Sequence, residues 1–198
     1  MIWVFGYGSL MWRPGFEYAE RRPATLRGYR RAFCRYSLRH RGTEESPGLV
    51  VGLVAGESCR GYAFRLAEEK RREVLEYLDD REGAGYFRRC LPLEVERNGK
   101  CSVEEAWVYL PDEAHRTHIK AIEPERMVRL IATGRGKSGT AHDYLIALIG
   151  VLEGLGRPDP ELIEVLRAVE RFKRGGSGKG PGASPSGPAA RAVNGVPQ

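Results

Sequence analysis

Short apolar segments bounded by glycine fill the first half of the chain, which is the pattern of β-strands. An apolar run at residues 2–5 stops at Gly6, and residues 48–55 are β-branched and apolar. Asn98-Gly99-Lys100 stands between two further segments and is a good hairpin turn. The pattern therefore predicts strands at residues 2–5, 24–36, 48–55, 60–66, 87–97 and 101–110.

Helical periodicity interrupts these strands once and then dominates the second half. Residues 67–79 place Val74, Leu75 and Leu78 on one face with charges opposite. Beyond Glu123-Pro124, apolar residues recur at i, i+3 and i+4 spacing. We expect strands followed by helices to form an α+β domain and not a doubly wound sheet, and several short strands can close into a small barrel. The later helices are predicted at residues 124–133, 140–155 and 159–173.

The composition changes near Gly175, where Gly, Ser, Pro and Ala become dominant. Such a segment cannot bury enough apolar area to offset the entropy lost on ordering. We therefore predict a disordered tail at residues 175–198 and a single folded domain at residues 1–174. The chain as a whole is 41% hydrophobic and 29% charged, which is ordinary for a soluble globular protein.

Most of the net charge of +6 at pH 7 lies in the last 26 residues, which include that tail. Residues 173–198 hold four basic residues and no acid, so the other 172 residues carry only +2. A nucleic-acid interface would cluster basic residues on a folded face among aromatic side chains, so we expect no nucleic-acid partner. No apolar run reaches the roughly 18–20 residues of a membrane span, and too few apolar residues precede Gly6 for a signal peptide. The expected compartment is the cytoplasm, with no membrane partner.

Three features resemble cofactor or metal motifs without completing them. Gly134-Arg-Gly136-Lys137-Ser138 lacks the first glycine of a P-loop, because Ile131 stands in its place. Gly6-Tyr-Gly8 lacks the third glycine of a dinucleotide fingerprint. His115-x-x-His118 has no third ligand nearby, and the four cysteines show no C-x-x-C spacing. We therefore expect no metal and no cofactor.

Candidate chemistry lies in three polar turns that contain glycine. Gly6-Tyr7-Gly8-Ser9 follows the first strand, where glycine allows close approach of a ligand and successive N–H groups suit an anion. Glu82 stands where a helix gives way to a glycine-rich turn, so its carboxylate can enter a cleft. Gly136–Gly139 opens a helix whose first turn holds Tyr144, and helix N-termini favour anions. The three turns predict a mouth for one small polar ligand, although a solvated helix face would explain the carboxylates and a core position would explain Tyr144.

Together these segments resemble the ChaC-like branch of the γ-glutamylcyclotransferases. The resemblance implies a small mixed β-barrel flanked by helices, and an activity that releases 5-oxoproline and Cys-Gly from glutathione without a metal or cofactor. It implies that Tyr7, Gly8, Ser9 and Leu10 form the loop that holds the γ-glutamyl group, that Glu82 is the catalytic acid/base, and that Tyr144 lines the site. The segments that carry it are Phe5–Pro14, Gly28–Cys34, His40–Thr43, Pro47–Val50, Leu78–Glu82, Gly136–Gly139 and Tyr144-Leu145.

Two other functions fit the same residues. One is the same reaction on other γ-glutamyl amines or γ-glutamyl amino acids. The other is a non-catalytic binding module whose basic tail reaches an anionic partner. For glutathione itself, Arg39 or Arg41 is a candidate for the glycine carboxylate, because arginine pairs bidentately with carboxylates; surface arginines flanking a strand are the alternative. The sequence predicts no particular oligomeric state.

Overall fold

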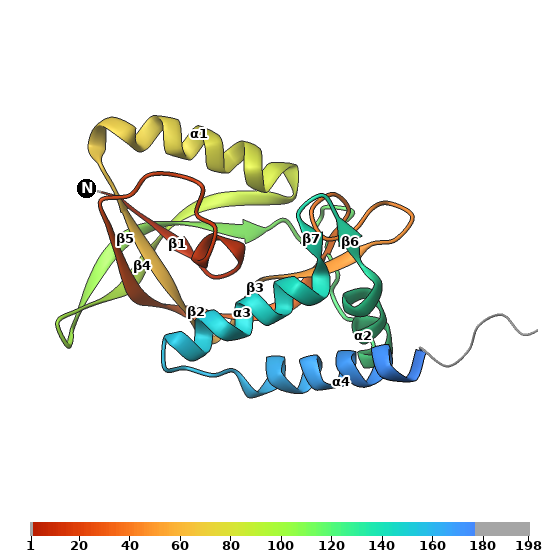
Figure 1. Cartoon of the computed structure of the whole chain (residues 1–198). Coiled ribbons are helices and arrows are strands. Elements are labelled where there is room, and N and C mark those ends of the chain that lie inside the picture. The colour runs from red at the N-terminus through yellow and green to blue at the C-terminus, as the bar shows by residue number, and fades with distance from the viewer. Residues whose placement is uncertain (1, 177–198) are drawn as a thin grey trace, which may run out of the picture.

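Five strands form a closed barrel in the computed structural model, which describes residues 2–176 (Figure 1). Most of the predicted tail therefore lies outside the described residues. The strand order is β1-β3-β2-β4-β5, and β1 closes the barrel by pairing in parallel with β5 while all other neighbours are antiparallel. This confirms the α+β fold with a small mixed barrel. The strands are β1 (Ile2–Gly6), β2 (Glu20–Ser37), β3 (Gly48–Leu66), β4 (Tyr86–Arg97) and β5 (Lys100–Pro111).

The two strands predicted at 48–55 and 60–66 are one continuous strand, β3. Its polar middle reads as a break in the sequence, but residues there pair with β2, for example Ser58 with Arg27. The register shifts between Arg27 and Tyr29, where Gly28 adopts a φ of +82° and forms the irregularity. The pairing survives because the polar residues lie on an exposed part of the ribbon, where they need no apolar partner.

Helices cover the barrel on two sides. Helix α1 (Arg71–Glu82), which follows the short 3₁₀ helix η2 (Glu68–Lys70), lies on one side, and α3 (Ala141–Gly154) and α4 (Pro160–Gly176) lie on the other (Figure 1). Helix α2 (Pro124–Thr133) starts at a proline, which suits the first helical position. The predicted helices at 124–133, 140–155 and 159–173 are thus confirmed within a few residues, and α4 ends at Gly176.

Strand β1 separates two apolar clusters, which explains why it carries no polar residue. Its side chains alternate, so that Trp3 and Phe5 join the main core with α3, whereas Ile2 and Val4 join a second core with α1. The second core takes the apolar face predicted for the helix, namely Val74, Leu75 and Leu78. Helix α1 is therefore fixed against the barrel, and its C-terminal end lies close to the end of β1.

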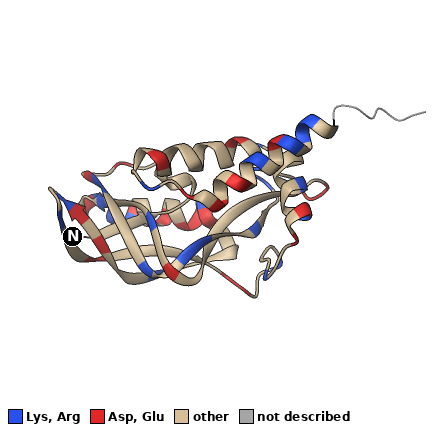
Figure 2. Ribbon diagram, turned by 90° about the horizontal axis from the view of Figure 1, so that it is seen from below, with Lys and Arg blue, Asp and Glu red and all other residues tan. Residues whose placement is uncertain are grey.

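Acidic and basic side chains are interspersed over the barrel (Figure 2). Many arginines on the strands are paired with an acid on another strand, as in Arg27 of β2 with Glu94 of β4 and Arg60 of β3 with Glu96 of β4. Among residues 2–176, no helix is long and apolar enough to cross a membrane. In the same part of the chain, no cluster of three or more His, Cys, Asp or Glu residues is placed to hold a metal ion.

Candidate active site

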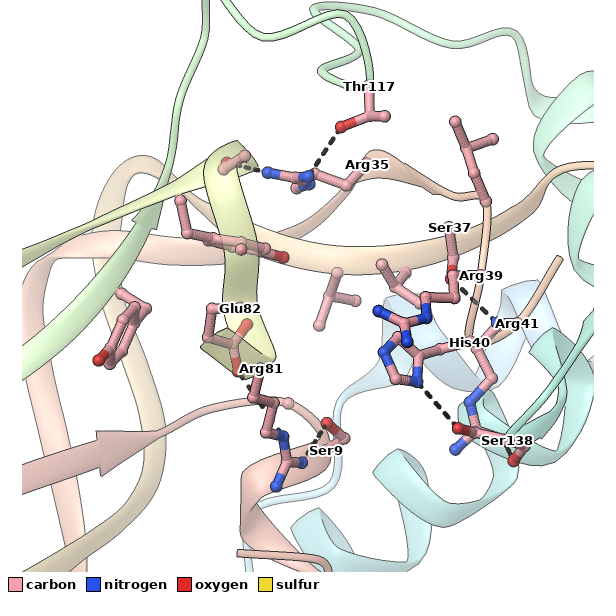
Figure 3. A pocket seen from close by; sticks show the side chains of 18 of the residues that line it. Ser9, Arg35, Ser37, Arg39, His40, Arg41, Arg81, Glu82, Thr117 and Ser138 are labelled. Carbon is pink, nitrogen blue, oxygen red and sulfur yellow. Dashed lines mark hydrogen bonds and ion pairs between the residues drawn. The ribbon is translucent and has the colours of Figure 1, made fainter. Parts of the chain in front are cut away.

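A cavity of about 790 Å³ opens between the end of β1, the end of α1 and the start of α3. Its volume is within the range of roughly 300–1,000 Å³ that small-molecule sites occupy. Figure 3 shows Ser9, Arg81 and Glu82 on one side of it and Arg39, His40 and Ser138 on the other. All of the residues predicted for the site line this one cavity: Tyr7, Gly8, Ser9, Leu10, Glu82 and Tyr144.

Glu82 is the last residue of α1, and the local sequence turns its side chain into the cavity. The helix ends because Gly83 takes a φ of +67°, a conformation that glycine adopts without strain, and a 3₁₀ helix, η3 (Gly83–Gly85), leads into β4. The Glu82 side chain is only 19% exposed. Burial raises the pKa of its carboxyl, while the cations of Arg81 and Arg35 oppose that rise.

The turn after β1 is held rigidly by groups outside it. The Tyr7 hydroxyl donates to the Tyr109 carbonyl at 2.7 Å, and Arg31 Nε donates to the Tyr7 carbonyl at 2.8 Å. At Gly8 a side chain would conflict with the wall, because a Cβ there would lie 3.0 Å from the Tyr144 hydroxyl. Glycine at this position therefore lets the turn and Tyr144 approach each other closely.

Arg81 ties this turn to the helix that carries Glu82. Its Nη2 donates to Ser9 Oγ at 3.1 Å, and its Nη1 donates to the carbonyls of Arg13 and Pro14, both at 2.7 Å. Its Nε lies 4.0 Å from Glu82 Oε1. Since Ser9 Oγ accepts from Arg81, its own O–H is left to donate to a ligand.

Tyr144 is both a core residue and part of the cavity wall, so the two alternatives for it are not exclusive. It is 4% exposed, and its ring lies 5.4 Å from that of Trp12. At the helix start beside it, Thr140 and Asp143 form a capping box, in which each side chain accepts from the backbone N–H of the other residue. The preceding residues form a small hairpin, β6 (Arg135–Gly136) and β7 (Gly139–Thr140).

This hairpin supports the opposite wall. The N–H groups of Lys137 and Ser138 donate to the carbonyls of Arg39 and His40, at 2.9 Å each. Arg41 is buried, and its Nη1 donates to the carbonyls of Ser138 and Thr140. Both candidate arginines line the cavity, but Arg41 is buried and held by these carbonyls, whereas Arg39 is exposed.

Sequence reasoning missed several residues of the wall, of which Arg35 matters most. Arg35 is 7% exposed and donates to the Gly85 carbonyl and to Thr117 Oγ1. Its guanidinium lies 4.1 Å from the centre of the Tyr86 ring. An arginine between the apolar residues Cys34 and Tyr36 was the available signal. Tyr86, Tyr109 and Thr117 also line the cavity without having been predicted.

Positive charge predominates around the cavity. Among residues 2–176, only two carboxylates, Asp80 and Glu82, line it. A cavity wall of low dielectric that holds more cations than carboxylates attracts anionic ligands. The phenols of Tyr7, Tyr86 and Tyr144 add no charge at neutral pH, because burial raises the pKa of each. The lining arginines are Arg13, Arg35, Arg39, Arg41, Arg81 and Arg116.

Comparison with known proteins places these features in one family. A family model described as ChaC-like protein matches residues 2–172. A glutathione-specific gamma-glutamylcyclotransferase of Schizosaccharomyces pombe is 36% identical over 189 residues, covering 87% of this chain and 93% of that protein. An Escherichia coli protein with the same description is 34% identical over 173 residues, covering 86% of this chain and 74% of its own. The crystal structure of a yeast gamma-glutamylcyclotransferase specific to glutathione superposes with a TM-score of 0.80 at 25% identity, covering 86% of this chain and 96% of that one.

Proposed function

This chain belongs to the ChaC-like family, and from that premise we propose that it is a gamma-glutamylcyclotransferase that cleaves glutathione to 5-oxoproline and Cys-Gly. The observation that carries the proposal is the place of Glu82. A largely desolvated carboxylate faces the same cavity as the Tyr7–Leu10 turn, in a wall rich in arginine. These are the groups that an acid/base reaction on a small anionic peptide requires.

The reaction is an intramolecular aminolysis. The α-amino group of the γ-glutamyl residue attacks the γ-amide carbonyl, a five-membered lactam forms, and the Cys-Gly amine leaves. Nucleophile and electrophile belong to one molecule, and well-oriented reactions of this kind reach effective molarities of roughly 10⁵–10⁸ M. The main tasks of the protein are therefore to hold the folded-back conformer and to move protons.

Glu82 performs the proton transfers. It accepts a proton from the α-ammonium group, which exposes the attacking lone pair, and returns that proton to the departing amine nitrogen. The nitrogen that becomes the lactam then loses a second proton, which Glu82 also passes to the departing amine. The carboxylate is therefore ionised again at the end of the reaction. Burial raises the pKa of Glu82 toward the operating pH, which favours both halves of this cycle. The base must be ionised, so kcat/KM falls as the pH falls through this raised pKa.

The two carboxylates of glutathione are assigned to opposite walls. The α-carboxylate binds at the Tyr7–Leu10 turn, where the Ser9 hydroxyl donates to it and Arg81 keeps that hydroxyl in place. The glycine carboxylate binds Arg39, because Arg41 is already committed to the β6–β7 hairpin. Figure 3 shows Arg39 across the cavity from Glu82, so the scissile bond lies between the two anchors.

Replacing Glu82 tests the proposal. Glu82→Gln keeps the shape and removes the base, and we expect kcat to fall by roughly 10²–10⁴-fold, the usual contribution of a positioned acid/base. Glu76→Gln is the matched control on the same helix, because its side chain is 72% exposed. The assay is mass-spectrometric detection of 5-oxoproline from reduced glutathione, after circular dichroism has shown that both variants fold. Wild-type turnover by folded Glu82→Gln would refute the assignment.

The same assay separates glutathione from other γ-glutamyl substrates. We expect release of 5-oxoproline from glutathione to exceed release from γ-Glu-Ala, because the cavity is large enough for a tripeptide and Arg39 stands at its far wall. Equal kcat/KM for the two would favour the broader activity. We also propose a cytoplasmic location, since the four cysteines are free thiols, as in a reducing compartment.

A further inference from the structure

Arg35 is a buried cation behind the turn that follows Glu82, and no motif draws attention to it. It lies on β2, is 7% exposed, and among residues 2–176 its side chain bonds to uncharged partners and to no carboxylate. An unpaired buried guanidinium is costly, so its retention calls for a physical reason. Its hydrogen bonds are instead with the Gly85 carbonyl and the Thr117 hydroxyl, the latter at 2.7 Å.

The contacts of Arg35 fix the backbone of η3. The Gly85 carbonyl accepts from Arg35 and also from the Asp112 N–H, at 2.9 Å in the second case. The guanidinium packs so closely on Gly85 that a Cβ at this position would overlap it. On its other side it stacks on the ring of Tyr86, 4.1 Å from the centroid. The segment between Glu82 and β4 is therefore held by one side chain.

We propose that Arg35 is a positioning residue for Glu82: it locks the Gly83–Gly85 turn that directs the carboxylate into the cavity, and it adds a buried positive charge to the surroundings of that carboxylate. The catalytic meaning of this role rests on the proposed function, but the effect on Glu82 does not. Arg35 acts through the turn and through its field, and it is not required to touch the substrate.

The charged and titratable groups that face Glu82 come from five elements. Arg81 on α1 and Arg35 on β2 lower its pKa, against the dominant effect of burial. The phenols of Tyr7, Tyr86 and Tyr144 face it from the β1 turn, β4 and α3, and they are neutral at working pH because their own pKa values are raised. The remaining ionisable groups of the same cavity are Arg13, Tyr36, Arg39, His40, Arg41, Tyr77, Asp80, Tyr109, His115 and Arg116.

Arg81 and Arg35 differ in what their removal would disturb. Arg81 also holds Ser9 and the carbonyls of Arg13 and Pro14, so its loss would disturb the substrate turn. Among residues 2–176, the Arg35 side chain donates its hydrogen bonds to Gly85 and Thr117 and none to that turn or to Arg39. Replacing Arg35 therefore changes the environment of Glu82 and leaves the two carboxylate anchors in place.

The experiment is a ¹³C NMR titration of the Glu82 side-chain carboxyl, assigned with Glu82→Gln, alongside the pH profile of kcat/KM for glutathione. In Arg35→Gln we expect the pKa of Glu82 to rise, because a cation that favours the ionised carboxylate is lost, and the acidic limb of the kcat/KM profile to move to higher pH by the same amount. Arg35→Lys retains the charge, so we expect the acidic limb of the kcat/KM profile to stay at its wild-type pH. We expect kcat to fall, because lysine cannot reproduce the two hydrogen bonds of the guanidinium. Arg21→Gln is the control, since Arg21 also lies on β2 and stacks on a tyrosine, Tyr62, outside the cavity.

Gly85→Ala provides an independent variant that leaves Arg35 in the chain. The new Cβ displaces the guanidinium, so the Glu82 titration should shift in the same direction, and the shift should not add to that of Arg35→Gln in the double variant. An unchanged Glu82 titration in both single variants, with activity lost equally at every pH, would overturn the proposal. A shifted titration in a protein that releases no 5-oxoproline would leave the role of Arg35 intact and reject the proposed function.

Discussion

Removing the Tyr7 hydroxyl separates a structural role from a substrate-binding one. The hydroxyl donates to the Tyr109 carbonyl at 2.7 Å, and Tyr7 and Tyr109 are 7% and 3% exposed. A donor so placed is not available to a substrate. We therefore expect Tyr7→Phe to lower stability and to leave glutathione turnover nearly unchanged below the melting temperature.

The cost follows from the buried acceptor that the substitution leaves behind. A buried polar group that loses its partner costs about 1–3 kcal/mol. For a domain of 150–250 residues, each kcal/mol lowers Tm by roughly 2–4 °C, so the expected fall is about 2–12 °C. Burial also raises the pKa of Tyr7 well above its usual value, so the hydroxyl remains a donor throughout the working pH range.

Differential scanning calorimetry and steady-state kinetics of the same preparation measure the two effects. Tyr18→Phe is the control, because Tyr18 is 39% exposed and its hydroxyl has no recorded partner among residues 2–176. A Tyr7→Phe protein with the wild-type Tm and a tenfold lower kcat would refute the reasoning, since the hydroxyl would then act on the substrate.

Ser9→Ala should raise KM for glutathione by about 10–100-fold with a smaller effect on kcat, because a hydrogen bond to a charged group contributes roughly 1.5–3 kcal/mol; steady-state kinetics measures both. Arg39→Ala should raise KM for glutathione severalfold but not for its C-terminal amide, and an equal rise for both would exclude a contact with the glycine carboxylate. Leu78→Ala should cost about 2–5 kcal/mol in urea unfolding, because Leu78 is fully buried between α1 and β1. A chain ending at Gly176 should keep wild-type kcat/KM, since the cavity is built from residues 7–144; a loss of turnover would assign a catalytic role to residues 177–198.

Local signals predicted most of the elements correctly. Asn98 and Gly99 take φ values of +49° and +76°, the left-handed pair that an Asn-Gly hairpin turn requires, and the strands on either side pair as expected. Helix α1 was predicted from the spacing of Val74, Leu75 and Leu78, which do form its buried face. The prediction of two separate strands in place of β3 was wrong. The middle of this long strand is exposed and lacks the apolar pattern, yet its pairing with β2 continues.

The site was predictable where local sequence shapes it, and not where distant segments do. The turn after β1 and the glycine that ends α1 both mark a change of backbone direction, so Ser9 and Glu82 could be proposed for one cavity. The one local signal for Arg35, its place between Cys34 and Tyr36, was not enough to distinguish it from the solvated arginines of β2. Its burial depends on Thr117, which is 82 residues away, and on a backbone bridge between Arg35 and His118.

Closure of the barrel by β1 has a consequence for synthesis of the protein. β1 is made first, yet its parallel partner arrives only with Trp107 of β5, and the bond between Tyr7 and Tyr109 spans 102 positions. At roughly 5–20 residues per second, a ribosome needs about 5–20 s to add that length. Throughout this interval one edge of an entirely apolar strand lacks its neighbour, and unpaired edges of this kind promote aggregation. The first strand is therefore exposed to aggregation until β5 emerges, and the cavity is complete only when Tyr144 of α3 has followed.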